Sequence, residues 1–200
     1  MKNKLFIIYE SYPENPREDH DNLGIVAYRH ERYILGEEKI YDPIDWLEEK
    51  LNLNPKGEYS NKRLNDLEQK FFQKYIALPT YIYDHSGVSI STTPFSCRWD
   101  SGKVGYIYQT KEKIREIYNW DVITNKRRDE IKNYLQGEID VLDEYLRGNV
   151  FRFCIKNENG EELDSCGGFY GTDWEKNGLK DNIDPELWPQ LENIEILYNE

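Results

Sequence analysis

Segments with the composition of β-strands occur in blocks along this chain and do not alternate one by one with helical segments. The order is two strands, two helices, three strands, two more helices, a hairpin and an acidic tail. A doubly wound parallel sheet requires strands and helices to alternate regularly. The order therefore predicts an α+β fold. In it, one antiparallel sheet of N-terminal strands, a central three-stranded meander and a C-terminal hairpin packs against about four helices.

Local residue chemistry sets the predicted elements. Runs rich in β-branched and aromatic residues indicate strands at 4–9, 23–29, 76–84, 88–93 and 104–108. Capping residues that precede apolar residues at helical spacing indicate helices, which begin at Asp42-Pro43, Asn61, Thr110 and Thr124. The last helix carries an apolar stripe, Ile131, Leu135, Ile139, Leu142 and Leu146, and Gly148 is its stop signal. A further short helix is predicted at Asp184-Pro185.

Two registers are compatible with the sequence of the C-terminal hairpin. A three-residue loop with a left-handed glycine pairs Ile155 with Leu163 and Lys156 with Glu162, so that apolar residues share a face. A two-residue Asn-Gly turn pairs Ile155 with Asp164 and mixes the faces. The first register is favoured because it keeps the alternation intact.

Length and charge limit the classes of function. The 200 residues are the size of one ordinary domain, so a single domain over 1–200 is predicted, with an acidic, less regular segment at 167–200. The formal net charge is −12, and residues 158–200 carry 12 acidic against 2 basic side chains. Phosphate backbones attract clusters of Lys and Arg, so no direct nucleic-acid binding is expected. An acidic surface serves solubility, engages a basic partner, or imitates a phosphate backbone.

The cysteines and the N-terminus bear on the compartment. Cys97, Cys154 and Cys166 are an odd and sparse set, which favours a reducing cytoplasm over a disulfide framework. In the favoured hairpin register, Cys154 and Cys166 lie on the polar face beside Arg152. The first apolar run ends at Glu10 and is too short for a signal peptide, and no run is long enough to span a membrane. A cytoplasmic protein without a membrane partner is therefore predicted.

The stretch 81–108, YIYDHSGVSISTTPFSCRWDSGKVGYIY, is the most distinctive part of the sequence. Residues 84–87 have the Asp and Gly positions of a turn between two strands, and residues 100–102 have similar turn chemistry. The two turns account for their Asp and Gly residues without any catalytic role. They leave four side chains unexplained: His85, Cys97, Arg98 and Trp99.

Catalysis and binding compete as interpretations of these side chains. His85 with Cys97 or Asp100 would form the reactive group of a small hydrolase or nucleotide-modifying enzyme. Arg98 and Trp99 suit the centre of a protein contact, where Arg and Trp are enriched. Members of a catalytic triad meet through side-chain geometry, and sequence neighbours usually point apart. Binding is therefore favoured over enzyme activity.

Metal and cofactor sites lack a recognisable pattern. No His or Cys stands at the spacing of a zinc site, so no metal is expected. The stretch 166–171, CGGFYG, lacks the Lys and Ser/Thr of a phosphate-binding loop, which favours a bulge or chain reversal, and no cofactor is expected. Three aromatic residues complete the candidate binding set: Phe169, Tyr170 and Trp174. A pocket of Tyr and Trp side chains for a small ligand or signal nucleotide is a further alternative.

Three separated segments carry a resemblance to a known family. They are DNLGIVAYRHERYILG at 21–36, IALPTYIYDHSGVSISTTPFSCRWDSGKVGYIY at 76–108 and ELDSCGGFYG at 162–171. In this order they resemble a family of short proteins of bacteriophages and integrative elements that has no established activity. Members tend to have Trp where this chain has Gly167. The resemblance implies a mobile-element accessory protein in a bacterial cytoplasm, and it assigns no catalytic residue.

The favoured function is therefore binding, and through it inhibition, of a host or antiviral-defence protein. The predicted contact surface is the Arg98-Trp99 turn or the acidic C-terminal third. The small enzyme and a small-ligand or nucleotide sponge are the alternatives.

Overall fold

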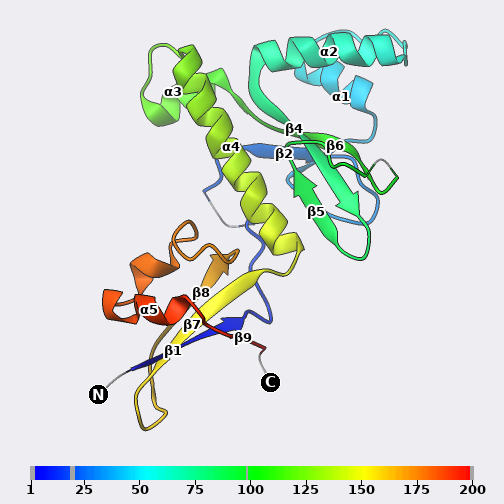
Figure 1. Cartoon of the computed structure of the whole chain (residues 1–200). Coiled ribbons are helices and arrows are strands. Elements are labelled where there is room, and N and C mark those ends of the chain that lie inside the picture. Colours follow the sequence, from blue (N-terminus) through cyan, green and yellow to red (C-terminus); the bar gives the residue numbers. More distant parts are fainter. Residues whose placement is uncertain (1–2, 19–20, 98, 199–200) are drawn as a thin grey trace. The chain divides into compact units, whose positions relative to one another are not determined.

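The computed structural model describes residues 3–18, 21–97 and 99–198 (Figure 1). The chain divides into two compact units, which we term the central unit (19–140) and the terminal unit (1–18 with 141–200). Each unit has a sheet of its own, and each has an apolar core. The expectation of one domain over 1–200 stays a prediction.

The α+β class is confirmed. Within the described ranges the chain forms five α-helices and two mostly antiparallel sheets, of four and five strands (Figure 1). The single predicted sheet is thus two sheets, because the first strand pairs with the C-terminal hairpin and the second strand pairs with the central strands. In the part of the chain that the structure describes, no helix is both long and apolar enough to cross a membrane.

The central unit contains the five-stranded sheet, in the order β3-β2-β6-β4-β5. Its strands are β2 (Ile25–Tyr28), β3 (Glu38–Lys39), β4 (Tyr75–Asp84), β5 (Val88–Ser91) and β6 (Ser101–Thr110). The predicted meander is wrong for its last strand, since β6 pairs with β4 and not with β5. The segment 92–100 therefore passes the end of β4 and brings β6 to its other side.

Strand pairing also corrects one of the two predicted turns. Ser101 and Gly102 pair with Tyr83 and Ile82, so they belong to β6 and not to a turn at 100–102. The turn at 84–87 is confirmed as the connection between β4 and β5, where residue 84 pairs with residue 88. Its Ser86 has a φ of 57°.

Four helices lie wholly or partly in the central unit: α1 (Pro43–Lys50), α2 (Asn61–Lys74), α3 (Lys111–Tyr118) and α4 (Asn125–Leu146, central as far as Asp140). Asp42 caps α1, as predicted, by accepting from two amides of the first turn. Ser60 caps α2, one residue before the predicted Asn61, because its hydroxyl reaches the amide of Arg63 at 3.1 Å. The first amides of a helix lack partners within the helix, and these caps supply them.

Helices α1 and α2 lie over one face of the central sheet (Figure 1). Aromatic side chains fill the core between these helices and the sheet. Trp46 stacks on Tyr106 with ring centroids 5.5 Å apart and an interplanar angle of 4°. Buried phenol groups need polar partners. Tyr106 donates to Glu68 at 2.6 Å, and Tyr108 donates to Glu38 at 3.0 Å. The sheet thus buries its aromatic rings without leaving these two hydroxyls unbonded.

The two buried phenols predict that the central unit loses stability in alkali. Burial raises the pKa of Tyr108 to about 12, and burial with donation to Glu68 raises the pKa of Tyr106. Both groups have an ordinary pKa of 10.0, so an unfolded chain loses these protons first as the pH rises. Their contribution is therefore complete below pH 10 and is lost from there toward pH 12 and beyond. For Tyr108 alone the loss corresponds to about 3 kcal/mol.

Urea unfolding on either side of pH 10 measures this loss, with Tyr108→Phe as the comparison. We expect the stability of the wild type to fall more steeply with pH than that of the variant, because the variant lacks one of the two phenols. Parallel profiles would contradict the assignment of Tyr108 as a group that keeps its proton in the folded chain.

The terminal unit contains the four-stranded sheet, in the order β8-β7-β1-β9. Its elements are β1 (Lys4–Tyr9), β7 (Val150–Lys156), β8 (Glu162–Tyr170), η1 (Leu179–Asn182), η2 (Pro185–Leu187), α5 (Trp188–Leu191) and β9 (Ile196–Leu197). β1 has its predicted bounds, and it pairs antiparallel with β7 and parallel with β9. The short elements after β8 pack into the core through Leu179, Leu187 and Leu191.

The β7–β8 hairpin differs from its predicted register by a bulge. The left-handed loop glycine and the pairing of Lys156 with Glu162 are as predicted. Ile155, however, pairs with Asp164 and not with Leu163. The cause is a β-bulge, because Leu163 is an extra residue on β8 that has no partner on β7. Such a bulge changes the face to which the following side chains of the strand point.

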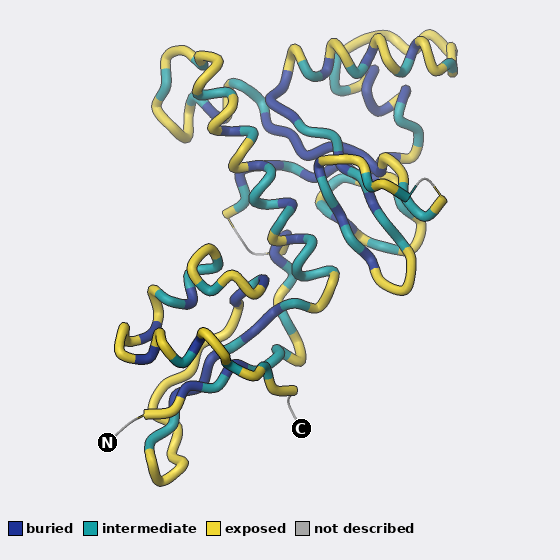
Figure 2. The backbone as a smooth tube through the Cα atoms, viewed as in Figure 1, coloured by how far each residue is buried: buried dark blue, intermediate teal, exposed yellow. Residues whose placement is uncertain are grey.

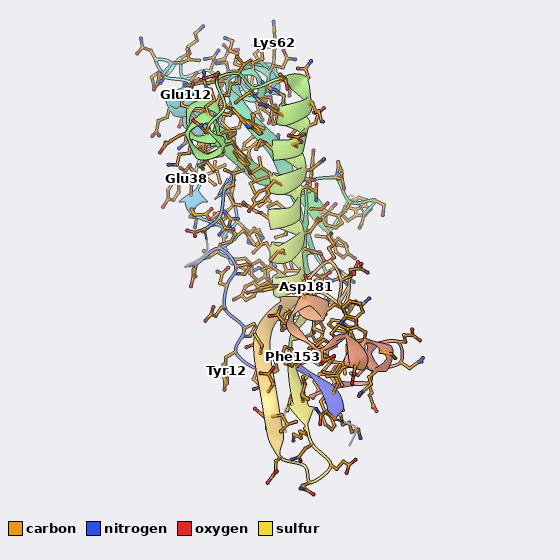
Figure 3. The ribbon with its side chains drawn as sticks, turned by 90° about the vertical axis from the view of Figure 1, so that its left-hand side faces the viewer. Tyr12, Glu38, Lys62, Glu112, Phe153 and Asp181 are labelled. Atoms are coloured by element: carbon orange, nitrogen blue, oxygen red, sulfur yellow. The ribbon has the colours of Figure 1, made fainter. Side chains whose placement is uncertain are left out.

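Cys154 and Cys166 do not share a face of this hairpin. Cys154 pairs with Ser165, whereas Cys166 pairs with Phe153, which Figure 3 labels on β7. The prediction that places both cysteines on the polar face is therefore wrong. Cys154 is buried and its Sγ donates to Glu162 at 3.2 Å, while Cys166 is exposed. Burial, together with the neighbouring Glu162 carboxylate, raises the pKa of the Cys154 thiol.

The glycine-rich stretch 166–171 contains a second bulge, as predicted, and Gly168 has a φ of 82° there. Glu10 lies against it, and its Oε2 accepts from the amide of Gly168 at 2.9 Å. A Cβ on Gly167 would lie 2.7 Å from Glu10 Oε1. A side chain at 167 would therefore displace the carboxylate of Glu10.

Candidate functional site

The segment 92–100, which we term the Trp99 loop, connects β5 to β6 beside the turn at 84–87. The main chain holds its base, because the amide of Asp84 donates to the carbonyl oxygen of Asp100 at 2.9 Å. The hydroxyl of Ser101 donates to the carbonyl oxygen of Cys97. Beyond these contacts β6 pairs with β4, so the central sheet fixes the end of the loop.

Three predicted catalytic candidates meet at this base. Asp100 Oδ2 accepts from Cys97 Sγ at 3.5 Å and lies 3.6 Å from His85 Nδ1. The side chains of His85 and Asp100 are 63% and 38% exposed, and Cys97 is half-buried. The meeting follows from the strand order, since the turn at 84–87 and the start of β6 lie at the same end of β4.

The order of contacts in this cluster differs from that of a nucleophilic relay. In a relay the imidazole lies between the carboxylate and the nucleophile, so that it can take the proton. Here Asp100 lies between the other two groups, and His85 and Cys97 are both directed to the same carboxylate oxygen. The arrangement is suited to holding the loop.

Two further contacts at this end of the sheet were not predicted from the sequence. Arg32 forms an ion pair with Asp84, and the ring of Tyr83 lies 5.7 Å from that of Phe95 and 6.2 Å from that of His85. Strand alternation could have predicted that Tyr83 and His85 lie on the same face of the sheet, since they are two residues apart. No local signal identifies Arg32, because it reaches the site from 52 positions away in the chain.

Trp99 is 95% exposed on this loop. Arg98, the other predicted binding residue here, lies outside the described residues. The other four tryptophans are each less exposed: Trp46, Trp120, Trp174 and Trp188. The loop therefore exposes to solvent a tryptophan, whose large apolar surface makes exposure to water unfavourable.

The remaining predicted binding residues belong to the terminal unit, and each has a structural contact. Phe169 is buried, and its ring lies 5.8 Å from that of Phe153. Tyr170 donates to the carbonyl oxygen of Glu14 at 2.8 Å. Trp174 packs edge-on against Phe151 at 5.4 Å, and it also lines an open hollow of about 390 Å³. These contacts account for the three aromatic residues as parts of the fold.

A second hollow, of about 670 Å³, lies over β3 and α1 and was not predicted from the sequence. Four acidic and two basic side chains line it, together with Tyr41 and Trp46. Glu38, labelled in Figure 3, accepts from Lys50 at 2.9 Å and from Trp46 Nε1 at 3.3 Å. Burial lowers the pKa of Lys50, but its hydrogen bonds with Tyr108 and Glu38 raise it overall. Glu38, Lys50 and Trp46 of this hollow thus bind one another.

Neither a metal site nor a similarity to known proteins assigns a function to the described residues. Among the described residues, no three His, Cys, Asp or Glu side chains are placed to hold a metal ion together. No protein-family model, curated protein or solved structure matches the chain.

Proposed function

We propose that this chain is an accessory protein of a phage or mobile element that acts by binding a host or antiviral-defence protein, with inhibition as the consequence. The Trp99 loop makes the contact, and Trp99 is its anchor. The observation that carries the proposal is a 95% exposed indole on a loop whose base is held by hydrogen bonds. The resemblance to phage and integrative-element proteins supplies the cellular context.

The size of the indole makes it an effective anchor. Its burial in a partner removes roughly 200 Å² from water. At about 25 cal/mol per Å² this is worth about 5 kcal/mol before the costs of association. Tryptophan is accordingly enriched among the residues that dominate protein interfaces. A loop base that is already ordered lowers the entropy lost on binding.

Charge and thiol state support the proposed partner and compartment. The net charge of −12 favours a partner with a basic surface and opposes binding to a phosphate backbone. Cys97, Cys154 and Cys166 are free thiols. Free thiols accord with the reducing bacterial cytoplasm that we propose as the location.

A small hydrolase or nucleotide-modifying enzyme is the second candidate function. The meeting of His85, Cys97 and Asp100 favours it, and the central position of Asp100 favours binding instead. Cys97→Ser separates the two candidates, because it removes the thiol and leaves Trp99 in place. The binding proposal expects unchanged capture of the partner by this variant. The small-ligand sponge stays a prediction.

Affinity capture from a lysate of the bacterial host tests the binding proposal. The full chain is compared with Trp99→Ala and with Tyr41→Ala, a control that removes an 82% exposed aromatic residue from the same unit. We expect the wild type and Tyr41→Ala to retain the same protein. Trp99→Ala should bind at least about 30-fold more weakly, the effect of losing an interface hot spot.

Both substitutions remove exposed side chains, so thermal unfolding of the variants should match the wild type. Equal capture by all three chains, or no captured protein at either low or high salt, would count against the proposal.

A further inference from the structure

β8 differs from the other strands that end a sheet. β3, β5 and β9 also lie at sheet edges and have two, four and two residues, whereas β8 has nine. An edge strand presents unpaired N–H and C=O groups, and short edges protect a protein from unwanted pairing. Within the described ranges no strand lies beyond β8. The terminal unit therefore carries one edge that is not shortened, with bulges at Leu163 and beside Gly168.

The edge is also open to solvent. Residues 162–168 of β8 are exposed in succession, while the neighbouring β7 is mostly buried (Figure 2). Leu163 is 53% exposed and offers an apolar contact. At the far end, the amide of Gly168 already has an acceptor from outside the hairpin, Glu10 Oε2 at 2.9 Å. An added chain would supply such acceptors along the remaining stretch, 163–167.

The negative charge of residues 157–170 favours a basic segment as the occupant of this edge. Residues 157–170 include four acidic side chains and no basic one: Glu158, Glu161, Glu162 and Asp164. Glu162 accepts from Ser165 at 2.7 Å and from Cys154 at 3.2 Å. These hydrogen bonds lower the pKa of Glu162. The terminal unit as a whole has 17 acidic and 8 basic residues, against 21 and 18 in the central unit.

We propose that β8 is a docking edge for an extended, basic segment of a partner protein, which joins the four-stranded sheet as an additional strand. Backbone hydrogen bonds along 163–167 provide the affinity, and the carboxylates select Lys and Arg in the added strand. A second copy of this chain is a poor occupant, because its own carboxylates would lie beside these. The docking edge is separate from the Trp99 loop, so either proposal can fail without the other.

Fluorescence anisotropy with synthetic peptides tests the docking edge. The probe is a labelled Lys-Val repeat of the length of β8, added to the full chain at low salt. Its controls are a Glu-Val repeat and a Lys-Val repeat with a central proline. We expect no binding of the acidic peptide and at least about tenfold weaker binding of the proline peptide, because proline removes a ladder hydrogen bond. Equal binding of both basic peptides would reduce the effect to charge attraction and overturn the proposal.

A charge reversal on the protein locates the peptide. Asp164→Lys is expected to weaken binding of the Lys-Val repeat by roughly three- to tenfold. Glu186→Lys makes the same change at an exposed position after β8 and should leave binding unaltered. Hydrogen exchange at 163–167 should slow when the peptide is bound. Equal effects of the two substitutions, or a dimer of this chain that Asp164→Lys dissociates, would overturn the proposal.

Discussion

Gly105→Ala is expected to destabilise the central unit by more than about 4 kcal/mol, a loss that only the most disruptive single substitutions reach. A Cβ on Gly105 would lie 1.9 Å from the carbonyl oxygen of Ala27. That oxygen belongs to the backbone of β2 and cannot rotate away as a side chain can. Gly105 also pairs with Tyr28 on one side and Thr80 on the other, so moving either strand breaks ladder hydrogen bonds.

Gly102→Ala is the matched control for this substitution. Gly102 lies in the same strand, and no heavy atom of the described residues beyond its chain neighbours comes within 4 Å of a Cβ there. Its replacement should leave stability within about 1 kcal/mol of the wild type, since alanine is the better strand residue where space allows. Urea unfolding followed by circular dichroism compares the two. Unfolding of both variants at the same urea concentration would contradict the described pairing of β2 with β6.

The buried ion pair between α1 and α2 is expected to show the second large effect. The side chains of Glu48 and Arg63 are 2% and 8% exposed. Arg63 contacts one oxygen, Glu48 Oε1, through Nη2 at 2.5 Å and Nε at 3.1 Å. Glu48 Oε2 is buried and has no hydrogen-bond partner among the described residues. Arg63→Met should therefore cost about 3–5 kcal/mol, because it leaves a buried carboxylate uncompensated.

Removing both charges should reverse all of that loss. The double variant Glu48→Leu/Arg63→Met is expected to lie between the wild-type stability and a gain of about 1–4 kcal/mol. Glu116→Gln breaks an exposed pair with Lys113 and should change stability by less than about 1 kcal/mol. A double-mutant cycle in urea measures these differences. A loss for Arg63→Met as small as that for Glu116→Gln would contradict the burial of the pair.

Elements that depend on neighbouring residues could be predicted from the sequence. β1 has its predicted bounds, and Asp42 caps α1 as expected, because alternation and capping act over a few positions. The strand order could not be predicted, since β5 and β6 are consecutive in sequence but not paired. The bulge at Leu163 was also missed, because a single added residue leaves no clear trace in the hydrophobic pattern.

The candidate site was also predicted only in part, because local motifs indicate which residues are near one another but not how their side chains contact. The turn at 84–87 and the loop before β6 suggested that His85 lies near Cys97 or Asp100, and the structure brings both of them to the same site. Their order of contact depends on side-chain directions that sequence spacing does not fix. The pairing of Glu48 with Arg63 likewise arises from the packing of two helices. Only the folded chain reveals it.

Site-specific photo-crosslinking tests most directly whether the Trp99 loop contacts a partner protein. A photoreactive benzophenone amino acid replaces Trp99 in the full chain, which is expressed in the bacterial host and irradiated. The same replacement at Tyr41, which is 82% exposed, is the control. We predict one discrete crosslinked protein from position 99 and none from position 41. The same products from both positions, or none from position 99, would contradict the account.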